Sequence, residues 1–514
     1  MALLIGGVLV GGLVALRAWG IAEVERALTA QGFQWTDRQD APLAVRWLDL
    51  SGPRGTADRL AVRAGWPVSV TLQAPELDLQ SWSGSRPAGG GESLIPVSIW
   101  VEDLTVRWGD RTLLTGLSGP LRPKIALAGP GGTLGLETLP DGSQKGTITA
   151  TLDLDLPEIR GRAEVSVRAA GTVVAEVRIP DAVLSHPLLA ESPLPAQPVT
   201  LVVDWQPSTN AISVAGTIGQ VRFTAAGTAE LGLRTVALDI EVAPTSLASV
   251  VGIFGGAIPE AEGARLGGSL GLVARVEGPP WSVDPEPTAE DLSAVGVLPQ
   301  GFRSRMVQWQ AQDANGYPTV RQIGPSHPGW TPLGAAGHMP AAVVAAEDGA
   351  FHTHPGYDLG AIREALAQAR AGERLRGGST LTQQLAKNLF LTDERTLARK
   401  LRELLYALEL ERSLPKPALL ALYLNVVEFG PGIHGLRAAA DAYFLKRPAG
   451  LNLQEAAWLA GILPGPRSAH ARARAGKARR ARMKTVLDRM AARGAITEAQ
   501  RDRAKAAPLR FVLE

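Results

Sequence analysis

The chain has 514 residues, which is too long for one hydrophobic core and predicts two or three domains. Hydrophobic residues make up 45% and charged residues 20%, a balance typical of globular domains rather than of disordered chains. The absence of cysteine excludes disulfides, iron–sulfur clusters, thiolate zinc sites and cysteine nucleophiles, and a net charge of +2 gives no reason to expect nucleic acid as a partner.

The N-terminus predicts a membrane anchor. Residues 1–16 carry no charge, and the apolar run extends to Ala22 if Arg17 snorkels to one face of the bilayer. No later stretch has 18 uncharged apolar residues, so one span is the maximum. We expect residues 1–28 to be an uncleaved, single-pass signal anchor in the bacterial inner (cytoplasmic) membrane, with the bulk of the chain in the periplasm. The alternative is a signal peptide that is cleaved.

Residues 42–276 show the period-two alternation of β-strands. Ile148, Leu152 and Leu154 fall on one face of a strand, and the threonine and aspartate residues between them fall on the other. This pattern predicts an antiparallel, β-rich extracytoplasmic domain with one apolar face and no assigned role. Residues 278–300 begin with the segment GPPWSVDPEPT, whose proline content predicts a linker.

The pattern turns helical in the last part of the chain, which predicts an α-helical domain over residues 301–514. Asp358 is expected to cap one helix, Ser379 the next, and Thr396 a longer helix that ends before Pro415. Pro417 is expected to open a further helix, which a glycine-rich loop follows. The chain is therefore predicted to be a multidomain α and β protein.

The residues that indicate chemistry begin with Glu347 and Asp348, which directly follow the apolar helix predicted over 341–346. Adjacent carboxylates at such a place are costly to desolvate, and a carboxylate tuned for proton transfer is one reason to keep them. The alternative is an exposed helix end. His352 and His354 do not complete a zinc site, because no HExxH motif or cysteine pair accompanies them.

Two further clusters follow within about sixty residues. Gly377 and Gly378 precede a hydroxyl-capped helix start, whose free amides suit anionic or polar groups, although an ordinary capped turn has the same pattern. Arg399 and Lys400 then share a helix face with Glu403, which is also typical of a solvated, salt-bridged face. The combination of carboxylate pair, amide-rich turn, cations and second carboxylate indicates a site.

These motifs resemble those of the peptidoglycan glycosyltransferases, glycosyltransferase family 51, found in monofunctional biosynthetic transglycosylases and class A penicillin-binding proteins. The pattern EDxxFxxHxG is matched from Glu347 to Gly356, GGSTxTQQxxKN from Gly377 to Asn388, RKxxE from Arg399 to Glu403, and KxxxLxxYLN from Lys416 to Asn425. A fifth, looser motif has Arg482 and Leu487 as candidates. The resemblance covers about residues 330–490.

The resemblance implies a lysozyme-like helical domain that polymerises lipid II into β-1,4-linked glycan, with inversion and release of undecaprenyl diphosphate. Glu347 is the expected base, and Glu403 is expected to orient the cations or to hold a divalent ion, Mg or Mn, with no organic cofactor. The expected substrate-binding residues are Asp348, Ser379, Gln383, Lys387, Arg395, Arg399 and Lys400. Lys416, Tyr423 and Asn425 are expected to pack helices.

The expected partners are lipid II, the growing glycan strand and the inner membrane, together with other cell-wall synthesis or envelope proteins through the β-rich domain. No transpeptidase activity is expected, because SxxK occurs only at Ser413–Lys416, SxN only at Ser208–Asn210, and KTG is absent. The basic run Arg472–Arg493 favours a membrane or a diphosphate over nucleic acid.

Two alternatives stay open at this stage. One is a catalytically silent envelope scaffold or lipid-binding protein, against which the presence of Glu347 and Glu403 counts. The other is a glycan-cleaving lytic enzyme. Such an enzyme needs an acid that protonates the leaving oxygen, but it has no need of the cations between Lys387 and Lys400.

Overall fold

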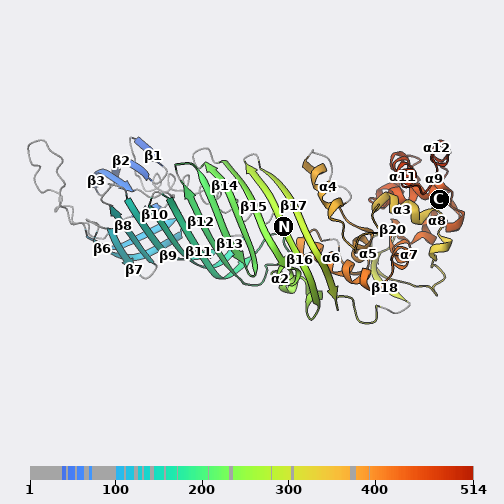
Figure 1. Cartoon of the computed structure of the whole chain (residues 1–514), viewed down its shortest axis with the longest axis horizontal. Coiled ribbons are helices and arrows are strands. Elements are labelled where there is room, and N and C mark those ends of the chain that lie inside the picture. The colour runs from blue at the N-terminus through green and yellow to red at the C-terminus, as the bar shows by residue number, and fades with distance from the viewer. Residues whose placement is uncertain are drawn as a thin grey trace, which may run out of the picture. The chain divides into compact units, whose positions relative to one another are not determined.

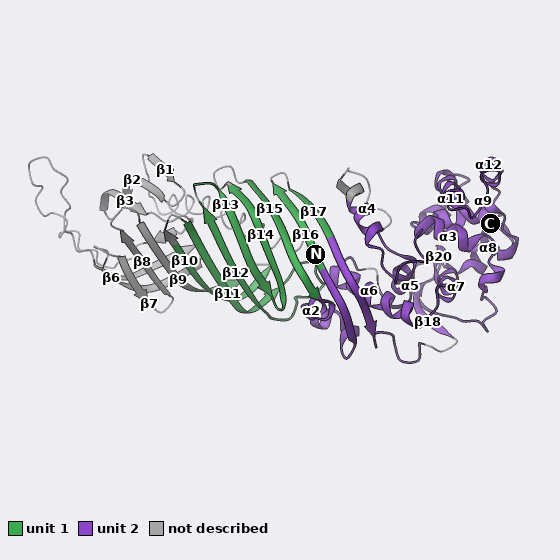
Figure 2. Cartoon of the chain, viewed as in Figure 1, with its two compact units in different colours: residues 1–245, 271–286 green, residues 246–270, 287–514 purple. Residues whose placement is uncertain are grey.

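The computed structural model describes the strands between residues 37 and 155, and residues 158–512 apart from 171, 207, 231–234, 279–280, 303–305, 371–377 and 393. The predicted anchor, residues 1–28, lies outside the described residues. Within the described part of the chain, no helix is both long enough and apolar enough to cross a bilayer. The chain divides into two compact units, residues 1–245 with 271–286 and residues 246–270 with 287–514 (Figure 2).

Strands fill the first part of the chain. A three-stranded sheet contains β1 (Asp37–Ala41), β2 (Ala44–Gly52) and β3 (Gly55–Val62). A fourteen-stranded sheet contains β4 (Ser69–Thr71), β5 (Trp100–Trp108), β6 (Arg111–Pro120), β7 (Ile125–Gly129), β8 (Gly132–Thr138), β9 (Gln144–Asp155), β10 (Ile159–Ala170), β11 (Thr172–Leu184), β12 (Gln197–Gln206), β13 (Ala211–Ile218), β14 (Val221–Glu230), β15 (Thr235–Ser246), β16 (Arg265–Gly278) and β17 (Ser282–Val295).

The large sheet is a meander in which strand order follows chain order from β4 to β17 (Figure 1). The register from β7 to β15 is antiparallel throughout, as between β12 and β13, where Val203 faces Val214. Burial alternates along the strands as predicted: Leu238 and Ile240 of β15 are buried, and Asp239 between them is exposed. The expected antiparallel β-rich region is confirmed.

A strand lies where the proline content predicted a linker. β17 spans most of residues 278–300, including Pro285 and Pro287. Proline lacks the N–H donor of a ladder and is therefore tolerated mainly on edge strands, and β17 is the last strand in the order of the sheet. Its charged residues, such as Asp284 and Glu290, are a further common feature of sheet edges.

Helices dominate the second unit, as predicted for the C-terminal part of the chain. The elements that lie wholly before α3 and the EDxxFxxHxG motif are α2 (Leu247–Gly252), η2 (Gly255–Ala257), η3 (Pro259–Ala261), β18 (Val307–Gln312), β19 (Pro318–Ile323) and η4 (Leu333–Ala335). The elements from α3 onward are α3 (Met339–Glu347), α4 (Leu359–Arg370), α5 (Leu381–Phe390), α6 (Leu397–Ser413), α7 (Lys416–Val426), β20 (Glu428–Gly430), β21 (Ile433–His434), α8 (Leu436–Phe444), η5 (Pro448–Gly450), α9 (Leu453–Ile462), α10 (Pro466–Arg474), α11 (Ala481–Ala492) and α12 (Glu498–Ala506).

The helix boundaries follow the capping signals closely. The side chains of Asp358 and Thr396 accept backbone N–H bonds at the starts of α4 and α6, as predicted. The prediction that Ser379 caps α5 is wrong by one residue, since Thr380 forms a capping box with Gln383. Both residues carry the hydroxyl group that a cap needs, so the sequence does not distinguish them.

The core of this unit surrounds α3 and α9. Most of α3 is buried, including Ala342 and Val343, so this helix lies inside the unit rather than on its surface. The largest fully buried side chains of the described residues include Trp458, Tyr423 and Tyr443. Glu347 is the last residue of α3, so the packing of this buried helix fixes the position of its backbone.

Candidate active site

Glu347 lies at the C-terminal end of α3, and its side chain is only 11% exposed. Its Oε2 accepts a hydrogen bond from Gln384 Nε2 at 3.2 Å, and its Oε1 lies 3.5 Å from the Arg482 guanidinium. Burial raises the pKa of Glu347 above its ordinary value, and the opposing effects of Gln384, Arg482 and Arg489 are smaller. A carboxylate of this kind holds a proton more readily than a solvated one, which suits proton transfer.

Tyr423 of α7 orients the partner of Glu347. Its hydroxyl donates to Gln384 Oε1 at 2.8 Å, so the Nε2 end of the amide points to Glu347. Burial first, and the nearby Glu347 and Asp348 second, keep the pKa of Tyr423 well above its ordinary value, so the phenol stays a donor. The expectation that Tyr423 only packs helices is therefore incomplete. Its place in the KxxxLxxYLN motif was a signal, but its target was not visible in the sequence.

Asp348, the next residue, belongs to a buried network of its own. Its carboxylate, 3% exposed, accepts the Leu381 N–H at 2.8 Å and contacts His354 Nε2 at 2.9 Å. His354 Nδ1 accepts the Gly356 N–H at 3.0 Å, so its Nε2 carries the proton that it donates to Asp348. Asp348 and His354 thereby join the loop after α3 to the start of α5.

Ser379 and Gln383 lie at the same helix start. Gln383 is buried, and its Oε1 accepts the Thr380 N–H at 3.0 Å, so this amide holds the cap. Ser379 Oγ accepts a hydrogen bond from Lys400 Nζ at 2.7 Å. The structure thus joins the second and third sequence motifs directly through Ser379 and Lys400.

The α6 cation cluster consists of Arg399 and Lys400, which both pair with Glu403. The Glu403 carboxylate is 4% exposed; Arg399 donates to Oε1, and Lys400 Nζ lies 2.5 Å from Oε2. The Lys400 side chain is 41% exposed, so the cluster presents positive charge to solvent. Of the two other predicted cations, Lys387 lies partly buried on α5, and Arg395 is exposed just before α6.

The surroundings of Glu403 do not fit a metal ion. Magnesium and manganese favour several oxygen ligands, whereas each oxygen of Glu403 already faces a cation. Among the described residues, no group of three or more His, Asp or Glu side chains is placed to hold a metal. Orientation of the cations is the role that this arrangement supports, and metal dependence of the reaction stays a prediction.

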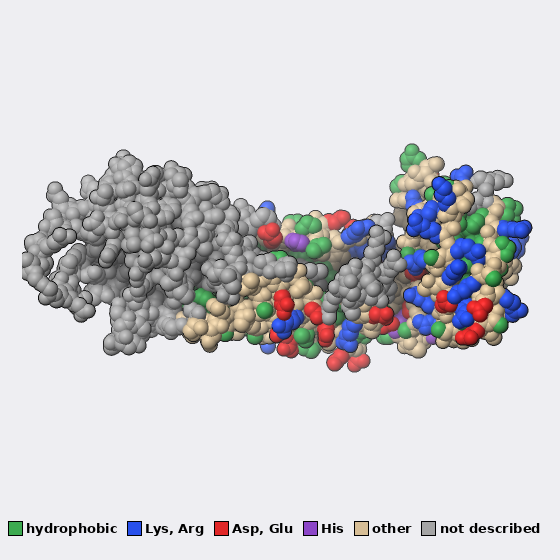
Figure 3. All heavy atoms as spheres, turned by 90° about the horizontal axis from the view of Figure 1, so that it is seen from above, with side chains coloured by type: hydrophobic (Ala, Val, Ile, Leu, Met, Phe, Trp, Pro, Cys, Tyr) green, Lys and Arg blue, Asp and Glu red, His purple; other side chains and the backbone are tan. Residues whose placement is uncertain are grey.

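α11 adds positive charge beside Glu347 that sequence reasoning largely missed. Arg482 approaches the Glu347 carboxylate, and Arg489 Nη1 donates to the Ala346 carbonyl at 2.9 Å. The Arg493 guanidinium lies against Gly349, in the space that a Cβ would take there. Arg482 and Arg489 are seven residues apart and so share one face of α11, and Arg493 caps its C-terminal end. Lys and Arg side chains gather on the face of this unit seen in Figure 3.

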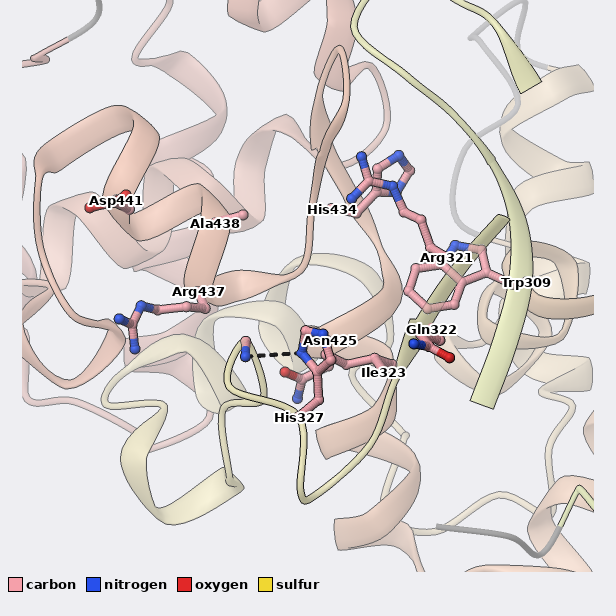
Figure 4. A pocket seen from close by; sticks show the side chains of 11 residues that line it. Trp309, Arg321, Gln322, Ile323, His327, Asn425, His434, Arg437, Ala438 and Asp441 are labelled. Atoms are coloured by element: carbon pink, nitrogen blue, oxygen red, sulfur yellow. Dashed lines mark hydrogen bonds between the residues drawn. The ribbon is translucent and has the colours of Figure 1, made fainter. Parts of the chain in front are cut away.

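A separate hollow of about 410 Å³ lies between the β18–β19 hairpin and α8 (Figure 4). Most polar groups that line it hold the fold together: Arg321 donates to the Gly432 carbonyl, His434 Nε2 to the Gln312 carbonyl, and Asn425 bridges to Thr331. Arg321 Nε and His434 Nδ1 are buried without a hydrogen-bond partner among the described residues. No candidate catalytic residue lines this hollow.

The motif region matches a known family. Residues 326–491 match the transglycosylase family, so the region that carries α3, α5, α6 and α11 is a transglycosylase domain. The resemblance inferred from the motifs is confirmed over this region.

Known relatives carry the same domain. The chain is 52% identical over 138 residues to the biosynthetic peptidoglycan transglycosylase of Shewanella amazonensis, which covers 27% of this chain and 56% of the relative. It is 50% identical over 139 residues to the protein of that name from Rhodospirillum centenum, covering 27% and 60%, and 47% identical over 137 residues to that from Xanthomonas axonopodis pv. citri, covering 27% and 56%. The chain thus spans somewhat over half the length of these relatives.

Proposed function

We propose that this chain is a peptidoglycan glycosyltransferase that polymerises lipid II into β-1,4-linked glycan strands, with inversion and release of undecaprenyl diphosphate. One observation carries the proposal: a buried carboxylate with a raised pKa, Glu347, lies in the same compact unit as the α6 cation cluster of Arg399 and Lys400. The names of the relatives that share the domain support it.

In the proposed reaction Glu347 is the general base. The acceptor sugar's 4-hydroxyl oxygen attacks the anomeric carbon of the donor and passes its proton to the Glu347 carboxylate. General base catalysis typically contributes on the order of 100-fold to 10,000-fold. Gln384, held by Tyr423, keeps one carboxylate oxygen in place, and the other oxygen lies beside Arg482.

The α6 cation cluster acts on the leaving side. As the bond between the anomeric carbon and the diphosphate oxygen breaks, negative charge accumulates on the diphosphate, and Arg399 and Lys400 are proposed to compensate it. Glu403 holds both cations in place before substrate arrives. Lys387, Arg395 and Ser379 are proposed to extend this binding surface.

The α6 cations also separate this proposal from a lytic enzyme. A departing sugar oxygen needs a proton, whereas a departing diphosphate needs only charge compensation. The raised pKa of Glu347 alone suits an acid as well as a base, so the cluster is the discriminating feature. A silent scaffold has no use for a buried carboxylate with its own oriented amide partner.

Location follows from the substrate rather than from the described residues. A lipid-linked donor lies in a membrane, so we propose that the chain works at the periplasmic face of the bacterial inner membrane, anchored by residues 1–28. Exposed cations lie between α10 and α11 and along α11, among them Arg479 and Lys484. Such cations suit an anionic lipid surface.

The test is incubation of the purified full-length chain with lipid II in detergent, with and without EDTA, magnesium or manganese, followed by sizing of the products. Polymer that lengthens with time, with equimolar release of undecaprenyl diphosphate, is the expected result. In a parallel reaction, preformed glycan should stay intact. Shortening of that glycan without any polymer from lipid II would assign the lytic activity instead.

A further inference from the structure

The helix that carries the α6 cation cluster has a second charged face. Arg402, Tyr406 and Glu409 follow one another at spacings of four and three residues, so they form a stripe of their own along α6. The stripe includes Arg402 of the RKxxE segment but none of the motif residues Arg399, Lys400 and Glu403. It contacts two segments before residue 326, where the match to the transglycosylase family begins.

The first of these segments is residues 246–270, which contains α2, η2 and η3. Glu260 of η3 accepts hydrogen bonds from Arg402 Nε at 2.9 and 3.0 Å, a further bond from the Arg402 fork, and one from Tyr406 Oη at 3.2 Å. The two charged side chains are 11% and 18% exposed. Paired, geometrically matched bonds of this type are stronger and more specific than a point contact.

Residues 246–270 are themselves firmly packed. Leu247, Val250 and Ile258 are no more than 1% exposed, and Ser246 caps α2 by accepting the Ser249 N–H. Glu260 therefore projects from an ordered support. Both the segment and α6 belong to the same compact unit.

The second segment is residues 296–298, which follow β17. The Glu409 carboxylate, 8% exposed, accepts the N–H groups of Val297 at 2.5 Å and Leu298 at 2.8 Å. Burial alone acts to raise the pKa of Glu409, but the backbone N–H donors and Arg412 hold it below its ordinary value. The carboxylate is therefore a stable anchor for α6 at neutral pH.

We propose that Glu260 and Glu409 are positioning residues that fix the rotation of α6, so that Arg399 and Lys400 face the lipid diphosphate. Side chains on one helix turn together when the helix rotates about its own axis, and successive residues are about 100° apart around it. A rotation of α6 by much less than this angle therefore turns Arg399 and Lys400 away from the diphosphate. In this proposal the segment 246–270, which carries Glu260, is needed for the activity of the second unit. This inference rests on the proposed function.

The test compares Glu260→Gln with Glu262→Gln in the full-length chain. Glu262 lies two residues away on the same segment and is exposed, so it receives the same chemical change without the ion pair. We measure kcat and KM for lipid II, affinity for undecaprenyl diphosphate in detergent, and Tm. The expected result is a roughly tenfold loss of kcat/KM and of diphosphate affinity for Glu260→Gln, with Glu262→Gln within about twofold of wild type.

A charge-swapped pair separates positioning from mere folding. Glu260→Arg and Arg402→Glu should each lose activity, and the double variant should recover most of it, because the ion pair is restored with reversed polarity. The inference is overturned if Glu260→Gln matches Glu262→Gln in both readouts, or if its loss only follows the fraction unfolded. Absence of polymer from wild type would instead remove the proposed function, and the diphosphate affinities would still decide the role of Glu260.

Discussion

The two units differ in whether they bury charged side chains. In the described strands of the first unit, ion pairs lie at the surface: Arg168 and Glu176 pair with their side chains 56% and 48% exposed. In the second unit surface pairs also occur, as between Arg501 and Glu498, but several carboxylates are buried, with Asp348 3% and Glu403 4% exposed. Exposed pairs contribute about 0–1 kcal/mol, whereas removal of one partner of a buried pair costs several times more.

This difference points to the unit that contains the proposed active site. A buried ion pair is a poor way to gain stability, because desolvation offsets most of the attraction. Glu347, Asp348 and Glu403 all lie in the transglycosylase region, each with its own fixed partners. The sheet has the usual distribution instead: its polar side chains face solvent, and its apolar side chains face the core.

The largest expected effect is on the proposed base. Glu347→Gln preserves the shape of the side chain and removes the proton acceptor, so kcat should fall by on the order of 100-fold to 10,000-fold while lipid II still binds. Polymer formation and lipid II affinity are measured side by side. The matched change in the sheet, Glu176→Gln, should leave both unaltered. Near-normal polymerisation by Glu347→Gln would show that another group takes the proton.

The next effect concerns the α6 cation cluster. Glu403→Gln leaves Arg399 and Lys400 close together without their shared anion, which should destabilise the unit by roughly 3 kcal/mol and cut turnover severely. Denaturant unfolding and polymerisation assays check the two parts. A free energy of unfolding equal to that of wild type would show that the Glu403 pairs contribute as little to stability as the exposed pairs of the sheet. Altered dependence of turnover on magnesium or manganese would support a bridging ion.

A pH profile tests the environment of Glu347. The base works when it is deprotonated, so activity is present above the raised pKa of Glu347 and is lost as pH falls through it. Arg482 lowers that pKa, so Arg482→Ala should move the acid limb of kcat/KM to higher pH. Arg479→Ala, an exposed change in the same basic region, is the control. An unmoved limb would show that Arg482 does not tune Glu347.

Glu409 gives a smaller effect on stability with a defined pH dependence. Its pKa is lowered in the folded protein, so its contribution is present at neutral pH and is lost as pH falls through the lowered value. Glu409→Gln should be less stable than wild type by about 1–2 kcal/mol at neutral pH. The difference should shrink as pH falls below 4.5, the ordinary value. Unfolding midpoints across pH measure this, with Glu262→Gln as the matched change.

The smallest effect is expected in the sheet. Arg168→Ala removes an exposed cross-strand partner of Glu176 and should change the free energy of unfolding by no more than about 0.5 kcal/mol. Raised salt should abolish even this difference. A loss as large as that of Glu409→Gln would remove the contrast between the two units.

The sequence by itself was enough to identify the domain and to predict most of the local structure. Motifs such as EDxxFxxHxG are contiguous, so residue type and spacing are enough to identify the transglycosylase domain. Period-two alternation predicted the sheet, and capping residues such as Thr396 predicted the helix starts, because both signals act within a few residues. The same local rules misplaced the cap of α5 by one residue and read the edge strand β17 as a linker.

Only the tertiary structure decided what each motif residue touches. Gln384 and Glu347 are 37 positions apart, and Arg402 and Glu260 are 142 apart, so no local pattern links either pair. Burial is also set by the whole fold: Asp348 and Glu347 are neighbours in sequence, but one is locked to His354 and the other is held at the site by Gln384. Pairing and desolvation depend on distances in space, so they give these two neighbouring carboxylates different surroundings.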